Sequence, residues 1–126
     1  AAVELVGRLA RLEGPPIAVL EDARKISTRG RTEVRSFDEL AGLLESLALA
    51  KIPSDQVTLD LGLARGISYY TGVIFELTHT SENRTVSLGG GGRYDGLVKA
   101  LGADEDVPAL GFAYNLDRVV ELAGGS

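Results

Sequence analysis

The 126-residue chain has no cysteine, no methionine and no tryptophan, and its one histidine is His79. Without cysteine, disulfides, thiolate catalysis and cysteine-ligated zinc sites are excluded. A single histidine cannot build a metal site, and no Gly-x-Ser-x-Gly elbow accompanies His79 as a hydrolase triad would need. No apolar run reaches the roughly 18 residues of a membrane span, and the opening residues lack the pattern of a signal peptide. We therefore expect a cytoplasmic protein without a metal site of its own.

Positive charge is also in short supply. The chain carries 18 acidic and 13 basic side chains, for a formal net charge of −5. Because general nucleic-acid binders neutralise phosphates with Lys and Arg, this balance argues against such a module. The most basic stretch, from Arg24 to Arg35, also contains Glu33 and is predicted to be solvated. The composition, 44% hydrophobic and 25% charged, is typical of a globular domain with a core.

The first part of the sequence has helical patterns. Residues 2–13 place apolar side chains at helical spacing, and Gly14-Pro15-Pro16 ends that helix. A second helix is predicted from Ser36, where Ser36-Phe37-Asp38-Glu39 has the capping-box pattern, to the stop at Ile52-Pro53. Between these helices, residues 17–35 are interpreted as a short apolar run followed by a loop or weak helix.

From residue 53 onward, alternating and β-branched residues indicate strands. Strands are predicted over residues 57–61, 69–77, 85–88 and 109–114, and helices over residues 94–101 and 116–122. A polar turn at residues 79–84 makes a hairpin, Gly89–Gly92 are expected to break the sheet, and Asp95 is interpreted mainly as a helix cap. The prediction is an α+β fold, an antiparallel β-sheet with flanking helices, divided into residues 1–52 and 53–126.

Three features of this second part could carry chemistry. The glycines Gly89–Gly92 permit either a close approach of backbone to ligand or a flexible turn. Arg65 could pair with a carboxylate or phosphate in two-pronged fashion, although a solvated arginine is the simpler interpretation. Arg118 forms either a surface ion pair, worth at most about 1 kcal/mol, or a contact with a triphosphate. These patterns lead as far as a glycine-lined cleft with two or three arginines that could face an anion.

Three blocks, in order, resemble histidyl-tRNA synthetase, a class II aminoacyl-tRNA synthetase. Residues 65–70, Arg-Gly-Ile-Ser-Tyr-Tyr, are similar to the family's Arg-Gly-Leu-Asp-Tyr-Tyr motif. Residues 91–97 match its Gly-Gly-Arg-Tyr-Asp-Gly-Leu motif without change, and residues 108–118 resemble class II motif 3. The resemblance implies that residues 1–52 are a helical lead-in at the end of the family's insertion region. Residues 53–126 would then be the C-terminal half of the catalytic core.

The resemblance also implies a role for each matching residue. Arg65 would be the catalytic residue, contacting the carboxylate of histidine and the α-phosphate of ATP and stabilising charge during adenylation. Tyr70 would hydrogen-bond the imidazole of histidine. Mg²⁺ would be held mainly by ATP phosphates, with no tightly bound cofactor. The implied histidine site contains Arg65, Tyr69, Tyr70, Tyr94, Gly91 and Gly92, and the implied ATP site contains Arg65, Gly111 and Arg118.

The implied function is activation of histidine with ATP and its transfer to tRNA(His). Motif 1, motif 2 and an anticodon-binding domain are not found in these residues, so we expect negligible activity from this chain alone. Family members are homodimers, and the resemblance admits a homodimer here. Two departures, Ser68 and Asn115-Leu116-Asp117, leave open a regulatory subunit of ATP phosphoribosyltransferase in histidine biosynthesis. A structural relative that binds neither ligand is the third alternative.

Overall fold

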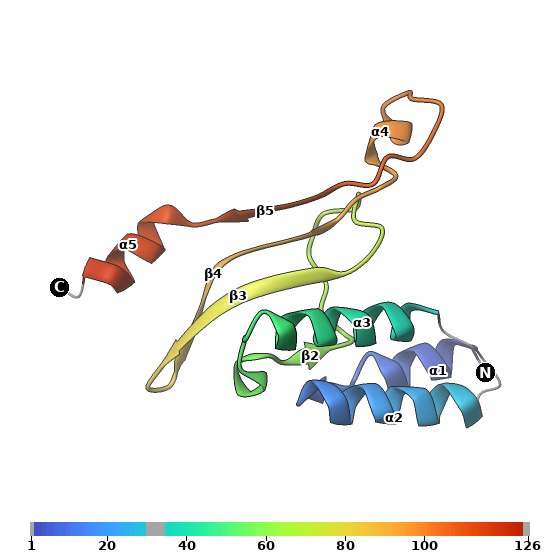
Figure 1. The fold of residues 1–126 in the computed structure, drawn as a ribbon, viewed down its shortest axis with the longest axis horizontal. Helices are drawn as coiled ribbons and strands as arrows, with labels where there is room; N and C mark the ends of the chain where they lie inside the picture. Colours follow the sequence, from blue (N-terminus) through green and yellow to red (C-terminus); the bar gives the residue numbers. More distant parts are fainter. Residues whose placement is uncertain (1, 30–34, 125–126) are drawn as a thin grey trace. The chain divides into compact units, whose positions relative to one another are not determined.

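The computed structural model describes residues 2–29 and 35–124 (Figure 1). The chain forms two compact units, residues 1–63 and residues 64–126. The first unit contains a two-stranded antiparallel sheet and the second a three-stranded one, each accompanied by helices, so the predicted α+β class is confirmed. Within the described ranges, no helix combines the length and the apolar character that crossing a membrane requires.

Three helices and a short sheet build the first unit. Helix α2 (Pro16–Arg29) contacts both α1 (Ala2–Leu9) and α3 (Ser36–Leu49), and the three lie side by side (Figure 1). Strand β1 (Glu13–Gly14) pairs antiparallel with β2 (Leu59–Asp60). The sheet therefore joins the end of the first helical segment to the segment that follows α3.

The core of the first unit lies where α2 meets α3. Leu20, Ala23 and Phe37 are buried against one another, and Ala23 is completely covered. Burying a large apolar side chain contributes about 1.5–3 kcal/mol, so Leu20 and Phe37 are the main contributors to helix packing. Around them lie the partly buried side chains of Leu9, Leu12, Leu40, Ala41, Leu44, Leu59 and Leu61.

The structure decides between the two alternatives predicted for the segment before α3. Residues 21–29 are helical rather than a loop, because α2 continues as a regular helix to Arg29. Its buried stripe includes Ala23 and Ser27, whose small side chains gave no strong apolar signal in the sequence. The remaining residues of the predicted loop, 30–34, lie outside the described residues.

The capping box predicted at Ser36 is not formed. The N-cap residue of α3 is Arg35, and no side chain caps the helix. Instead the backbone N–H of Asp38 donates to the carbonyl of Arg35 at 3.0 Å. The helix itself is confirmed, since its packing against α2 does not depend on a cap.

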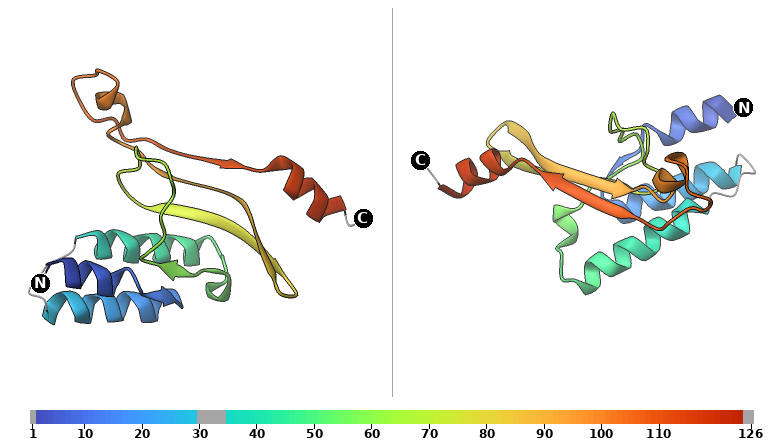
Figure 2. Two further views of the ribbon diagram at one scale, coloured as in Figure 1. Left: turned by 180° about the vertical axis from the view of Figure 1, so that it is seen from behind. Right: turned by 90° about the horizontal axis from the view of Figure 1, so that it is seen from above.

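The second unit is built on a sheet of order β3-β4-β5 with β4 in the centre (Figure 2). Strand β4 (Arg84–Arg93) pairs antiparallel with both β3 (Ile74–Ser81) and β5 (Leu110–Tyr114). The single-turn helix α4 (Leu97–Ala100) follows β4, and α5 (Leu116–Gly124) follows β5. The last predicted strand and helix are confirmed as β5 and α5.

The four consecutive glycines continue β4. Gly91 stands between Phe75 of β3 and Phe112 of β5, so the prediction that Gly89–Gly92 break the sheet is wrong. Glycine is disfavoured in the interior of a strand. Backbone hydrogen bonds to two neighbouring strands outweigh this disadvantage here, because they do not require a side chain.

Several predicted boundaries shift as well. The hairpin is confirmed, but β3 begins at Ile74 and extends to Ser81, so the predicted strand start at Tyr69 and the turn at residues 79–84 are wrong. The turn contains only Glu82 and Asn83, and Glu82 has a φ of 52°, as tight hairpin turns require. The strand predicted at residues 57–61 is reduced to β2, preceded by the 3-10 turn Ser54–Gln56.

Candidate functional site

The central strand β4 presents glycines to both faces of the three-stranded sheet. Side chains alternate along a strand, and residues directly opposite one another in neighbouring strands share a face. Gly90 and Gly92 therefore share one face with Gly111, which stands opposite Gly92. Gly91 belongs to the opposite face with Phe112. The glycines predicted for the site are thus divided between the two faces.

Arg65 and Tyr70 occupy the space that side chains at two of these glycines would fill. A Cβ atom on Gly90 would collide with Nη1 of Arg65, and one on Gly92 would lie 2.8 Å from the ring of Tyr70. Both contacts are closer than real Cβ atoms make. The absence of side chains on β4 is therefore what lets Arg65 and Tyr70 lie directly on the strand.

The guanidinium group of Arg65 makes few hydrogen bonds among the described residues. Its Nη1 lies 3.5 Å from the carbonyl oxygen of Phe75, at the outer limit of a hydrogen bond. Its Nε is buried and has no hydrogen-bond partner among the described residues, and such a group costs about 1–3 kcal/mol. A guanidinium group is suited to binding a carboxylate or a phosphate.

Three of the four tyrosines form a cluster beside Arg65. The ring centroids of Tyr69 and Tyr70 are 5.1 Å apart, those of Tyr69 and Tyr94 are 5.6 Å apart and edge-on, and those of Tyr70 and Tyr94 are 6.4 Å apart. A Cβ on Gly111 would lie 2.7 Å from Oη of Tyr94, so this ring lies on the same face as Arg65. We call this side of the sheet the tyrosine face.

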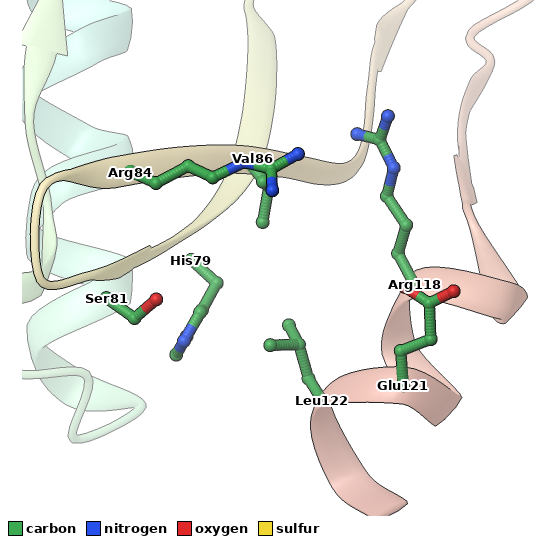
Figure 3. A pocket seen from close by; sticks show the side chains of 7 residues that line it. All are labelled: His79, Ser81, Arg84, Val86, Arg118, Glu121 and Leu122. Atoms are coloured by element: carbon green, nitrogen blue, oxygen red, sulfur yellow. The ribbon is translucent and has the colours of Figure 1, made fainter. Parts of the chain in front are cut away.

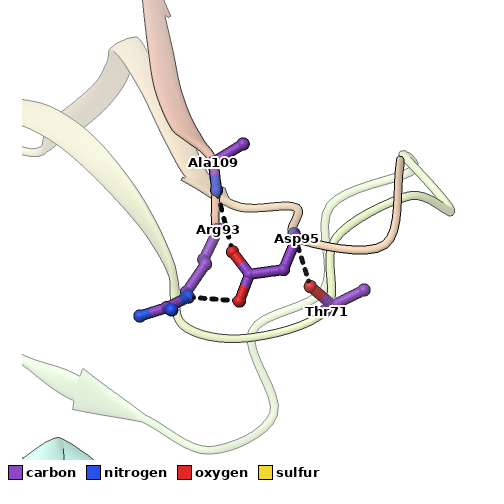
Figure 4. Close-up of polar contacts among 4 residues, drawn as sticks. All are labelled: Thr71, Arg93, Asp95 and Ala109. Carbon is purple, nitrogen blue, oxygen red and sulfur yellow. Dashed lines mark hydrogen bonds and ion pairs between the residues drawn. The ribbon is translucent and has the colours of Figure 1, made fainter. Parts of the chain in front are cut away.

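The sequence suggested that Asp95 caps the following helix, and this prediction is wrong. The N-cap of α4 is Gly96, and no side chain bonds to it. The carboxylate of Asp95 accepts hydrogen bonds from the backbone N–H of Ala109 at 2.9 Å and from Nε of Arg93 at 2.7 Å (Figure 4). These two contacts, that of Ala109 first, lower the pKa of Asp95. Asp95 therefore ties the end of β4 to the start of β5.

Arg118 contacts the same strand at another point. Its Nη1 donates to the carbonyl oxygen of Ser87 at 2.8 Å, three residues before Gly90 and so about 10 Å along the strand. Its backbone N–H donates to Oδ1 of Asn115 at 3.2 Å. Within the part of the chain that the structure describes, Arg118 forms no ion pair, so the surface ion pair considered for it is not found there.

A hollow opens beside Arg118, between the β3–β4 hairpin and α5 (Figure 3). Among its lining residues, the sequence indicates a binding role for Arg118 alone. The sequence pattern predicts His79, Ser81 and Arg84 in a polar turn, whereas these residues lie in paired strands. The lining side chains are those of His79, Ser81, Arg84, Val86, Arg118, Glu121 and Leu122. Among the described residues, no group of acidic or histidine side chains could hold a metal ion.

The structure thus gathers most of the predicted site on the tyrosine face: Arg65, Tyr69, Tyr70, Tyr94, Gly92 and Gly111. Gly91 faces the other side, and Arg118 lies further along β4. The tyrosine face combines a guanidinium over a glycine strand with an adjacent aromatic cluster, and these groups are chemically suited to a small anionic, ring-bearing ligand.

Comparison with known proteins places the chain in a family. The family model described as histidyl-tRNA synthetase matches residues 1–119. The chain therefore belongs to the histidyl-tRNA synthetase family. A solved structure, that of a histidine–tRNA ligase subunit from Alicyclobacillus acidocaldarius, matches with a TM-score of 0.59 and 35% identity. The match covers 86% of this chain and 31% of that chain.

Three relatives show the extent of the similarity. The histidine–tRNA ligase of Thermococcus kodakarensis is 37% identical over 122 residues, 95% of this chain and 27% of that protein. That of Gloeobacter violaceus is 42% identical over 110 residues, 86% of this chain and 23% of the relative. The cytoplasmic histidine–tRNA ligase of Dictyostelium discoideum is 36% identical over 127 residues, which cover 97% of this chain and 25% of that protein. The chain spans about a quarter of the length of these relatives, and their names give no support to a role in histidine biosynthesis.

Proposed function

We propose that this chain is the segment of a histidine–tRNA ligase that recognises histidine and the phosphates of ATP. The observation that supports this most directly is the position of Arg65, whose guanidinium lies on the glycine strand next to the tyrosine cluster. A positive group with free donors suits a carboxylate, and hydroxylated rings beside it suit a planar polar ring such as imidazole. Free histidine combines both of these groups.

Each site residue has a proposed task. Arg65 pairs with the carboxylate of histidine and then stabilises the charge that develops at the α-phosphate during adenylation. Tyr70 forms a hydrogen bond with the imidazole of histidine, and Tyr69 and Tyr94 form the rest of the surface against which the imidazole packs. Gly92 acts indirectly, by leaving the space that the ring of Tyr70 occupies, whereas Gly91, which faces the other side, contributes only its backbone.

The ATP subsite is proposed to extend along β4. Gly111 acts in this subsite by leaving space for the hydroxyl of Tyr94, and Arg118 holds the terminal phosphates with guanidinium N–H groups other than the one bonded to Ser87. Mg²⁺ would be held by the phosphates, with few protein ligands.

Calorimetric titration of the chain with histidine, ATP and a non-hydrolysable histidyl-adenylate analogue tests this proposal. We expect the analogue to bind more tightly than histidine, because it occupies both subsites. Arg65→Ala should weaken binding of histidine at least tenfold, whereas Arg8→Ala, on the exposed surface of α1, should leave it unchanged. A folded chain that binds none of the three ligands would overturn the proposal.

The complete reaction is proposed for the whole protein rather than for these 126 residues. Misplaced reactants can cost orders of magnitude in rate, and the relatives named as ligases are about four times longer. Histidine, ATP and tRNA(His) are the proposed partners in that context, with a homodimer and a cytoplasmic location. We expect the isolated chain to give no histidine-dependent ATP–pyrophosphate exchange above background. A clear exchange signal would contradict this.

A further inference from the structure

Asp95 is bonded to three separate segments of the second unit. Its carboxylate accepts from Ala109 and Arg93, as described above, and its carbonyl accepts from the N–H of Val107 at 3.0 Å. Its own N–H donates to Oγ1 of Thr71 at 3.0 Å (Figure 4). One residue thus links the loop before β3, the end of β4 and the segment that enters β5.

Two of these segments carry rings of the tyrosine cluster. Thr71 directly follows Tyr70, and Asp95 directly follows Tyr94, so their hydrogen bond joins the immediate neighbours of both rings. The N–H of Thr71 also donates to the carbonyl of Arg93 at 2.8 Å. The backbone segments that carry Tyr70 and Tyr94 are therefore held together by hydrogen bonds in which neither ring takes part.

The carboxylate has a further effect through Ala109. The N–H of Tyr94 donates to the carbonyl of Ala109 at 2.9 Å, while the N–H of Ala109 donates to Asp95. Residues 98–108 are exposed, so they offer little packing that could hold this segment in place. In the ion pair between Arg93 and Asp95, the side chain of Arg93 is 55% exposed and that of Asp95 is 28% exposed. An exposed ion pair of this kind adds little to stability. The backbone bonds are therefore the important ones.

We propose that Asp95 is a positioning residue that aligns Tyr70 and Tyr94 in the free chain, without touching the substrate. The identity of the ligand, histidine, rests on the proposed function, but the alignment itself does not. A pocket whose rings are already ordered loses less side-chain freedom on binding. Loss of Asp95 should therefore weaken histidine binding although every residue that contacts histidine is retained.

Near-ultraviolet circular dichroism can test the alignment directly. The chain has no tryptophan and four tyrosines, three of which belong to the cluster, so the tyrosine band reports mainly on their packing. We expect Asp95→Ala and Thr71→Val to remove at least half of this band while the far-ultraviolet spectrum is retained. Both variants should weaken histidine binding at least fivefold. Asp104→Ala, a substitution on the exposed loop after α4, should change neither.

The conservative variant separates positioning from charge. Asp95→Asn keeps an oxygen that can accept from Ala109, so it should restore at least half of the band that Asp95→Ala loses. A wild-type tyrosine band in folded Asp95→Ala would overturn the inference. If Asp95→Ala does not fold, wild-type bands in both Asp95→Asn and Thr71→Val would overturn it instead. If wild type fails to bind histidine but the band still depends on Asp95, the proposed function is wrong and the positioning role holds.

Discussion

The guanidinium of Arg65 lies where a side chain on Gly90 would have to be. The same Cβ would also collide with the carbonyl oxygen of Phe75, a backbone atom of the paired strand β3. The arginine could swing away from a new methyl group, but this carbonyl cannot move without disturbing the β3–β4 pairing. The proposed binding residue and the sheet itself therefore depend on the same missing side chain.

Replacing Gly90 should for this reason destabilise the second unit. We expect Gly90→Ala to lower the free energy of unfolding by about 1–3 kcal/mol, the usual cost of forcing atoms into a filled space. Gly66→Ala is the matched control, because its new Cβ would meet nothing within 4 Å, and it should change stability by less than about 0.5 kcal/mol. Urea denaturation measures both. Equal losses in the two variants would contradict the steric explanation.

Arg65 should lower the free energy of unfolding of the free chain, although it is needed for histidine binding. Its buried Nε has no partner among the described residues, so Arg65→Met removes an unsatisfied donor and keeps an unbranched apolar stem. We expect the free energy of unfolding to stay equal or to rise by up to about 1–3 kcal/mol, while histidine binding is lost. Arg65→Lys, which retains charge without the planar fork, should recover binding only in part. A clearly less stable Arg65→Met chain would refute this expectation.

The carboxylate of Asp95 should make stability depend on acid pH. Hydrogen bonds from Ala109 and Arg93 lower its pKa in the folded chain, so the unfolded chain takes up the proton first. The stabilisation is therefore present above the unfolded pKa of about 3.9 and is lost as pH falls through the lower folded pKa. Unfolding free energies measured from about pH 2 to 6 should decline less steeply in Asp95→Asn. Parallel curves for wild type and variant would count against this linkage.

The face of the sheet opposite the tyrosine cluster should promote association between copies of the chain. Phe112 and Tyr114 are 64% and 55% exposed there, with their rings stacked at 6.2 Å, and large exposed apolar patches commonly mark contact surfaces. Sedimentation velocity should give an average mass that rises with concentration above 13.3 kDa. Phe112→Ser with Tyr114→Ser should lower the association constant at least tenfold. Val3→Ser, on α1, is the control, and a wild-type chain that stays monomeric would contradict this prediction.

Local patterns in the sequence were sufficient for several elements of the fold. The leucine stripe after Ser36 predicted α3, and the apolar runs near the end predicted β5 and α5, because each of these elements shows its period within a few residues. The family was likewise readable from short blocks around Arg65, Gly91–Gly92 and Arg118. These features depend on neighbouring residues alone.

The tertiary structure determined what distant residues do together. The sequence predicted that Gly89–Gly92 break the sheet, whereas they pair with strands on both sides and lie in its central strand. The sequence could not show this, because backbone pairing does not depend on which side chains are present. Asp95 had the sequence context of a helix cap, yet its carboxylate accepts from Ala109, fourteen positions away. Sequence alone established which residues are present and where helices and strands tend to form. Contacts across the sheet set their roles, since hydrogen bonds and close packing depend on distance in space.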